Sequence, residues 1–200
     1  MKKKQNKWQD TFFNKAKREG YPARSIYKLK EIDQKYKLIR QGDIVLDLGC
    51  APGSWMMYVS EKVGPKGKVF GIDIQDIKIK MGKNMKFIKA DIREIIKNIE
   101  IRKFDVVLSD LAPKTTGIKI TDAAKSLELA REALKIAQKT LKAKGHFVVK
   151  NFESEDTVQF INILKKYFNT VKRNSPQATR KQSREFYIIC KDHKVEDHGA

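Results

Sequence analysis

The amino-acid sequence predicts one α/β domain whose mostly parallel sheet carries helices on both faces. Short apolar runs alternate with longer amphipathic stretches along the chain, which is the pattern of repeated strand–helix units. The length of 200 residues corresponds to about one domain. Hydrophobic residues make up 40% of the chain and aromatic residues 9%, so it has enough apolar side chains to build a core and does not resemble a disordered basic tail.

The chain begins with a basic segment. Ten Lys or Arg residues stand against only Asp10 and Glu19 in the first 30 positions, which gives this segment a net charge of +8. Residues 25–38 carry apolar side chains at helical spacing, and Ser25 is a possible N-cap. We expect a basic N-terminal arm over residues 1–24, a folded domain over residues 25–191 and a frayed tail over residues 192–200.

The strands and helices of the domain follow from the pattern that comes next. Short runs rich in apolar residues predict strands at Ile44–Leu48, Lys68–Ile74, Met85–Ala90, Phe104–Ser109, His146–Lys150 and Phe186–Cys190. The stretches between them predict helices at Trp55–Val63, Arg93–Ile99, Asp122–Lys142 and Glu155–Phe168. In the longest helix, Ala124, Leu127 and Ala130 begin one apolar face. No repeat or linker divides the chain.

The charge and the cysteine count exclude several classes of protein. A net charge of +19 indicates a polyanionic partner, either nucleic acid or an anionic membrane. No apolar run approaches the roughly 20 residues that cross a bilayer, and the basic N-terminus leads into polar sequence, unlike a secretory signal. Cys50 and Cys190 stand far apart without clustered histidines, which argues against a zinc site and a disulfide scaffold. We therefore expect a cytoplasmic protein with reduced thiols and no metal.

A glycine-rich turn and three acids predict a ligand site at one edge of the sheet. The turn Asp47–Trp55 joins the first strand to a helix, and Gly49 and Gly53 let its backbone approach a ligand closely. It departs from the dinucleotide fingerprint, because Ala51 and Ser54 replace glycines. Asp73, Asp91 and Asp110 each follow one of the next three strands, and the carboxyl ends of parallel strands share one edge. An acid at the position of Asp73 commonly binds a ribose diol.

A lysine ends a further apolar strand. Burying an ammonium group without a partner is costly, so Lys150 either reaches solvent at the strand end or pairs with an acid, for which Asp110 is the natural candidate. Lys28 and Glu185, at the start of the last predicted strand, are ordinary surface charges when each is considered alone.

Five segments together resemble a known family. In order along residues 20 to 190 they are Ser25–Leu29, Asp47–Trp55, Ser109–Pro113, Val148–Lys150 and Ser183–Tyr187. They resemble the FtsJ/RrmJ (RlmE) family of S-adenosylmethionine-dependent ribosomal RNA 2′-O-methyltransferases. The resemblance implies a Rossmann-like class I methyltransferase fold, with a seven-stranded sheet whose last strand is antiparallel. It implies the catalytic residues Lys28, Asp110, Lys150 and Glu185, and the cofactor contacts Gly49, Gly53, Trp55, Asp73, Asp91 and Asp110.

The sequence departs from the family pattern at two small residues of the turn. Cys50 and Ser54 stand where many members carry Ala and Gly, and we expect them only to stiffen the turn. The role of Lys150 stays open: desolvation and the nearby Lys28 would lower the pKa of Lys150 and suit it as a base, whereas Asp110 and Glu185 would raise that pKa and suit an orienting role.

The implied substrate is a uridine of large-subunit ribosomal RNA, bound by a monomer. The alternatives are a transfer-RNA ribose methyltransferase, a non-catalytic ribosome-assembly factor and a nucleotide-dependent dehydrogenase. The complete set of four catalytic residues argues against the assembly factor. The proline in the turn argues against the dehydrogenase. Trp8, Phe12 and Tyr21 lie among the cations of the arm and offer stacking surfaces. We expect the RNA phosphates to contact Lys7, Lys15, Lys17, Arg18, Arg24, Arg180, Lys181 and Arg184.

Overall fold

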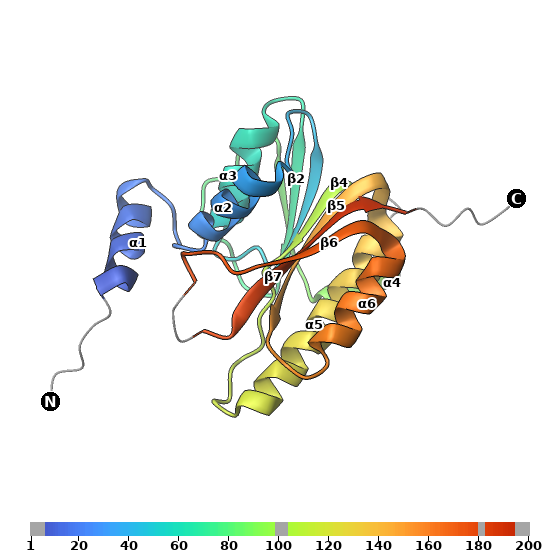
Figure 1. Cartoon of the computed structure of the whole chain (residues 1–200). Helices are drawn as coiled ribbons and strands as arrows, with labels where there is room; N and C mark the ends of the chain where they lie inside the picture. Colours follow the sequence, from blue (N-terminus) through green and yellow to red (C-terminus); the bar gives the residue numbers. More distant parts are fainter. Residues whose placement is uncertain (1–6, 99–103, 180–182, 195–200) are drawn as a thin grey trace, which may run out of the picture.

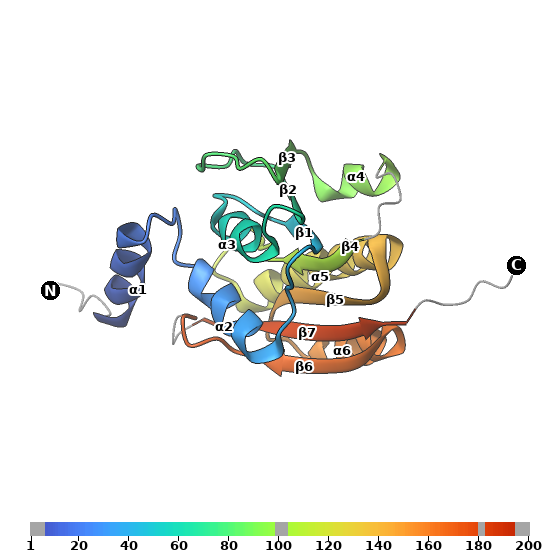
Figure 2. The same cartoon turned by 90° about the horizontal axis from the view of Figure 1, so that it is seen from above.

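The computed structural model describes residues 7–98, 104–179 and 183–194, which form a central sheet with helices on both sides (Figure 1). Within these residues the sheet has seven strands in the order β3-β2-β1-β4-β5-β7-β6, and Figure 2 shows them side by side. The strands are β1 Ile44–Leu48, β2 Lys68–Asp73, β3 Met85–Lys89, β4 Phe104–Ser109, β5 Leu141–Phe152, β6 Phe168–Asn174 and β7 Glu185–His193. β1 to β5 pair in parallel, whereas β7 is antiparallel to both β5 and β6, which confirms the predicted fold class.

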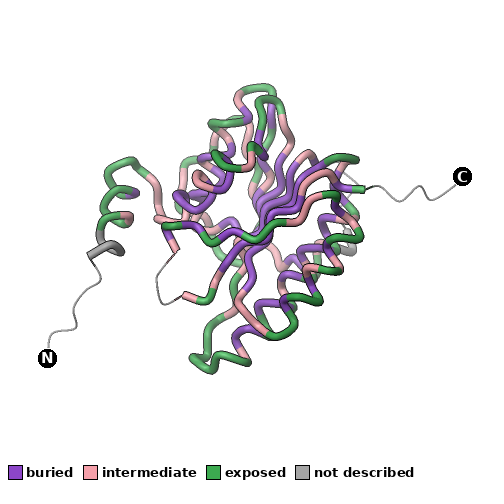
Figure 3. Tube along the Cα trace, viewed as in Figure 1, coloured by how far each residue is buried: buried purple, intermediate pink, exposed green. Residues whose placement is uncertain are grey.

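Helices cover both faces of this sheet. They are α1 Lys7–Arg18, α2 Ile26–Tyr36, α3 Ser54–Val63, α4 Ile92–Asn98, α5 Lys119–Thr140 and α6 Thr157–Tyr167. α2 and α3 lie on one side of the sheet and α5 and α6 on the other (Figure 1). Successive strand residues point to opposite faces, so Val45 belongs to the core cluster that includes α2 and α3, whereas Leu46 belongs to the cluster that includes α5 and α6. The central strands are accordingly the most continuously buried part of the chain (Figure 3).

Two elements were not predicted from the sequence. β6 is an edge strand of mostly polar residues, and it pairs only with β7, so it shows no apolar run. α1 lies within the segment expected as a basic arm. It contacts the rest of the protein through Ala16, which is 2% exposed, and through Phe12, whose ring centroid lies 5.4 Å from that of Tyr27. Trp8, Phe12 and Ala16 repeat at the four-residue spacing of an amphipathic helix, so the sequence held a signal for α1 that the prediction of a charged arm passed over.

Several boundaries differ in detail from the prediction. α2 follows Ser25 as expected, but the Ser25 side chain makes no capping hydrogen bond. In α5 the first buried apolar residue is Ala123, whereas Ala124 is exposed, so the apolar face begins one position earlier than predicted. The last strand continues to His193, and the amide of Lys194 donates to the carbonyl of Tyr167 at 2.8 Å. The remainder of the expected tail, residues 195–200, lies outside the described part of the chain.

Candidate active site

The turn between β1 and α3 forms one wall of the site. Gly49 and Gly53 have φ angles of 77° and 110°, a left-handed backbone that side chains rarely adopt. A Cβ atom on Gly53 would lie 2.8 Å from Ile79, and one on Gly49 would lie 3.0 Å from Leu111. Glycine is therefore needed at both positions for the turn to lie this close to the neighbouring loops.

Two of the predicted acids hold the edge of the sheet together. The carboxylate of Asp73 accepts hydrogen bonds from the amides of Ala51 at 2.9 Å and Gln75 at 2.8 Å, which ties the end of β2 to the turn. Asp91 accepts from the amide of Arg93 at 2.9 Å and from its guanidinium Nε at 3.0 Å. The side-chain hydrogen bond from Arg93 lowers the pKa of Asp91 below its usual value. Both carboxylates are thus held by backbone amides at the end of their strands.

Asp47 is a further acid at this edge, to which the sequence assigned no role beyond opening the turn. It is fully buried, and neither of its carboxyl oxygens has a hydrogen-bond partner among the described residues. Burial, together with the nearby Asp110 and Asp73, raises the pKa of Asp47 well above its usual value. A buried carboxyl without a partner, beside two further acids, suits a ligand that brings positive charge and hydroxyl groups. S-adenosylmethionine has both, so the residues at this edge fit the cofactor implied by the sequence.

Four charged side chains from distant segments meet beside the turn. Lys28 comes from α2, Asp110 follows β4, Lys150 lies on β5 and Glu185 begins β7. The Nζ atom of Lys150 lies 3.2 Å from Oδ1 of Asp110 and 3.5 Å from Oε2 of Glu185. Lys28 forms an ion pair with the other oxygen, Oε1, of Glu185. The structure therefore joins all four predicted catalytic residues in one chain of alternating charge.

This cluster is shielded from solvent. The side chains of Lys28, Lys150 and Glu185 are each only about a tenth exposed, and that of Asp110 is 19% exposed. Burial alone would lower the pKa of Lys150, but Asp110 and Glu185 outweigh it and raise that pKa above the usual value. Burial likewise opposes ionisation of Asp110, but Lys150 and Lys28 outweigh it and lower the pKa of Asp110. Lys150 is therefore an ammonium group and Asp110 a carboxylate at neutral pH.

Tyr187 supports the cluster from within the core. Its hydroxyl donates to Oδ1 of Asp110 at 2.6 Å, and its side chain is fully buried. It lies on β7 directly opposite Lys150 on β5. Tyr187 belongs to a motif in the sequence, but the sequence gives it no role. Its contact with Asp110 becomes visible only once β7 is paired with β5.

Trp55 and Ser54 hold the start of α2 against the turn. The indole N–H of Trp55, which is 3% exposed, donates to the carbonyl of Ser25 at 2.9 Å. The hydroxyl of Ser54 accepts from the amide of Ala23 at 2.8 Å and donates to its carbonyl at 3.1 Å. Ser54, expected only to stiffen the turn, therefore also anchors the segment that leads to Lys28.

Comparison with known proteins agrees with this geometry. The model of the FtsJ-like methyltransferase family matches residues 21–193. The chain belongs to this family.

Similar proteins cover nearly the whole chain. A protein of Desulfatibacillum aliphaticivorans named Ribosomal RNA large subunit methyltransferase E is 48% identical, covering 94% of this chain and 92% of its own length. A protein of the same name from Bdellovibrio bacteriovorus is 46% identical, covering 90% of this chain and 94% of its own. Among solved structures, one assigned as a ribosomal RNA methyltransferase of Plasmodium falciparum has a TM-score of 0.75 at 30% identity, covering 86% of this chain and 98% of its own. Human methyltransferase-like protein 13, with a TM-score of 0.61 at 16% identity over 85% of this chain and 84% of its own, shares the fold.

Of the cations expected to contact RNA, the described ones lie in two places around the candidate active site. Lys17 and Arg18 are exposed on α1, whereas Lys15 lies 3.9 Å from Glu19 and over the ring of Tyr27. Arg24 is half-buried in the segment between α1 and α2, and Arg184, beside Glu185, donates to the carbonyl of Glu153 at 2.7 Å. The side chain of Lys7, as well as Arg180 and Lys181, lies outside the described part of the structure.

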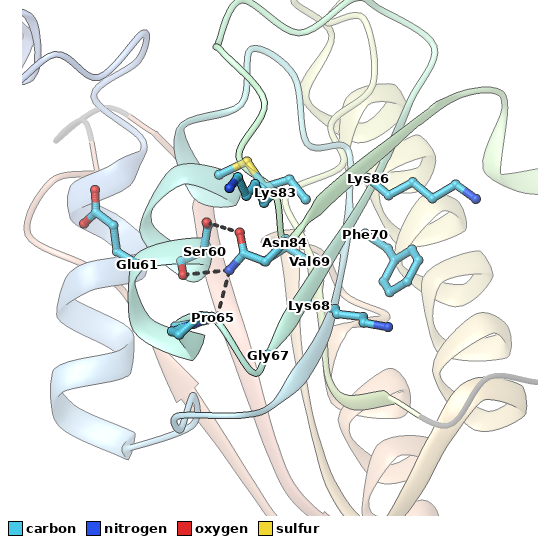
Figure 4. A pocket seen from close by; sticks show the side chains of 12 residues that line it. Ser60, Glu61, Pro65, Gly67, Lys68, Val69, Phe70, Lys83, Asn84 and Lys86 are labelled. Atoms are coloured by element: carbon cyan, nitrogen blue, oxygen red, sulfur yellow. Dashed lines mark hydrogen bonds between the residues drawn. The ribbon is translucent and has the colours of Figure 1, made fainter.

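An open groove of about 710 Å³ lies away from the candidate active site (Figure 4). Its floor includes Asn84, whose side chain accepts from the Ser60 hydroxyl at 2.7 Å and donates to the Gly64 carbonyl at 3.0 Å. Its walls come from the end of α3, the turn that follows it and the first residues of β2 and β3, whereas the candidate active site is at the carboxyl ends of the strands.

The described residues contain neither a candidate membrane span nor a candidate metal-ion cluster. None of their helices is long and apolar enough to cross a membrane. In the same residues, no group of three or more His, Cys, Asp or Glu side chains is arranged to hold a metal ion.

Proposed function

We propose that this protein transfers the methyl group of S-adenosylmethionine to a ribose 2′-oxygen, that of a uridine, in large-subunit ribosomal RNA. The observation that carries the proposal is the buried chain of Lys28, Glu185, Lys150 and Asp110 beside the glycine turn. The relatives named Ribosomal RNA large subunit methyltransferase E support the choice of RNA. The proposal includes a cytoplasmic location and a monomeric enzyme.

The cofactor would lie along the carboxyl ends of β1, β2 and β4. When bound, it supplies a methyl group made electrophilic by a sulfonium. Asp73 is suited to accept hydrogen bonds from ribose hydroxyls, because each carboxylate oxygen has a second lone pair beyond the one used by the backbone amide. Gly49 and Gly53 keep the turn free of side chains, and Asp91 provides a further anion next to Asp73 along the edge.

Lys150 orients the attacking oxygen. As an ammonium group held by Asp110 and Glu185, it can donate a hydrogen bond to the 2′-oxygen and so fix the direction of the remaining lone pair. Methyl transfer requires in-line attack, and a hydroxyl fixed in this way loses little further orientational freedom at the transition state. Lys28 neutralises the second oxygen of Glu185 and keeps this acid directed toward Lys150.

The proton of the hydroxyl has an acceptor in the same cluster. Once the oxygen bonds to a methyl group its proton becomes strongly acidic, so a carboxylate takes it without an elevated pKa. Asp110 is such a carboxylate, because Lys150, Lys28 and the Tyr187 hydroxyl keep it ionised. The proton leaves from there to solvent.

The proposal is tested by mapping 2′-O-methyl groups on total cellular RNA with and without the protein. We expect one ribose of the large-subunit RNA to lose its methyl group when the protein is absent and to regain it on complementation. Loss of a methyl group from a transfer RNA alone, or from a base instead of a ribose, would contradict the proposal.

A further inference from the structure

A second cavity lies between the N-terminal helix and the cofactor turn. It has a volume of about 330 Å³. One wall is α1, the second is the segment between α1 and α2, and the third is Lys78 from the loop after β2. The lining residues are Phe13, Ala16, Lys17, Gly20, Tyr21, Pro22, Ala23, Arg24 and Lys78.

The cavity is positively charged. Three of its lining residues, Lys17, Arg24 and Lys78, are cations and none is an acid. Glu19, the acid directly after α1, has partners elsewhere: it accepts from the Tyr27 hydroxyl at 3.0 Å and lies 3.6 Å from Nζ of Lys30. The cations come from three separate segments and surround a concavity, so they are placed to bind one anionic group together.

The cavity also presents an aromatic ring at its rim. Phe13 is 58% exposed, which is unusual for a phenylalanine on a helix that packs against a domain. Its neighbour Phe12 is packed against Tyr27 and is not available for stacking, contrary to the role that its position in the sequence suggested. An exposed ring next to several cations is the combination that binds a nucleotide, with the base on the ring and the phosphate on the cations.

The cavity is attached directly to the proposed active site. The amide of Lys78 donates to the carbonyl of Pro52, in the glycine turn, at 2.9 Å. Ala23 is bonded to Ser54 at the other end of that turn. Lys28 lies in the first turn of α2, four residues after Arg24. A nucleotide in the cavity would therefore lie next to the nucleotide at Lys28.

We propose that this cavity binds one nucleotide of the substrate RNA that flanks the methylated one, with its phosphate on Lys17, Arg24 and Lys78 and its base on Phe13. This inference rests on the proposed function, which it extends by naming the site that holds the neighbouring part of the strand.

The test compares Lys78→Ala with Lys80→Ala, which removes the same charge from an exposed lysine of the same loop that does not line the cavity. The probe is unmodified large-subunit ribosomal RNA transcribed in vitro, and its Kd is measured between 50 and about 300 mM salt. Lys78→Ala should weaken binding roughly three- to tenfold and flatten the salt dependence by about one phosphate contact, whereas Lys80→Ala should change both only slightly. Equal effects of the two variants would overturn the inference.

Phe13→Ala tests the base. Because Phe13 is exposed, its removal should leave the fold intact, weaken RNA binding roughly fivefold or more and leave the salt dependence unchanged. Unchanged affinity would overturn the stacking role.

Methyl transfer by the wild-type protein, measured on the same RNA, separates the two proposals. If the wild type methylates the RNA while Lys78→Ala and Lys80→Ala bind it alike, only the cavity assignment fails. If the wild type binds the RNA but transfers no methyl group, the proposed function fails.

Discussion

The charge state of Lys150 depends on its neighbours. The sequence placed a lysine at the end of a strand and named its possible partners, but the balance between desolvation and attraction needs the distances to Asp110 and Glu185. Those distances keep the pKa of Lys150 raised. Its position could thus be predicted from an apolar run followed by a lysine, while its protonation could not.

The raised pKa of Lys150 predicts a flat pH profile. The ammonium form is complete below the raised pKa and is lost only as pH rises through it, so single-turnover methyl transfer should change less than about threefold between pH 7 and 9. A neutral Lys150 acting as the base would instead give a rate that climbs about tenfold per pH unit in this range. A measured rate that rises about tenfold per pH unit between pH 7 and 9 would contradict the orienting role of Lys150.

Tyr187 provides a second prediction at this scale. Tyr187→Phe removes the hydrogen bond to Asp110 and nothing larger, so kcat should fall roughly three- to tenfold while KM stays close to the wild-type value. The same hydrogen bond lowers the pKa of Asp110, so the acid limb of the pH profile should move to higher pH. Tyr167→Phe, at the end of α6, is the matched control and should leave both unchanged. An unmoved acid limb in Tyr187→Phe would mean that its hydroxyl does not act on Asp110.

At the scale of elements, prediction from sequence worked where an element is buried on one or both faces. β1, β4 and the core of β5 carry continuous apolar runs because helices cover them on both sides. β6 lies at the edge of the sheet and buries too little to leave a pattern, whereas α1 has helical apolar spacing that its many charges obscured. The partners of the turn were also hidden, because Ser54 and Trp55 act through backbone groups of a segment about 30 residues earlier.

Asp33 is expected to be the main stabilising residue at the end of α2. Its carboxylate accepts from the amides of Leu38 at 3.0 Å and Ile39 at 2.9 Å and from the hydroxyl of Tyr58 at 2.7 Å. Asp33→Ala leaves these donors without a partner in a buried place, so the free energy of unfolding should fall by about 2–4 kcal/mol in urea denaturation.

The matched control for this prediction is Asp156→Ala. Asp156 is exposed before α6 and its side chain makes no capping hydrogen bond, so its removal should change the free energy of unfolding by less than about 0.5 kcal/mol. If Asp33→Ala were as mild, α2 would be held by its apolar face alone.

At the scale of the whole molecule, the charge of +19 is divided between sites. Lys28 and Lys150 are enclosed with acids in the cluster, and Lys17, Arg24 and Lys78 surround the cavity beside it. The sequence predicted a polyanionic partner from the total charge, but Lys78 joins Lys17 and Arg24 only through the fold. The sequence could not predict this cavity, because the loop after β2 and the N-terminal helix are distant along the chain and meet only in the folded protein.

The proposed function requires that four segments spread over the chain assemble one site for methyl transfer to a ribose oxygen. Its most direct test is the yield of alkali-resistant 2′-O-methyl nucleotide when purified wild-type and Lys150→Ala proteins act on large-subunit ribosomal RNA with S-adenosylmethionine. The wild type should form this product, and Lys150→Ala should form it at least about 100-fold more slowly with calorimetric cofactor affinity retained. Near-normal turnover by Lys150→Ala, or methylation of a base by the wild type, would contradict the account.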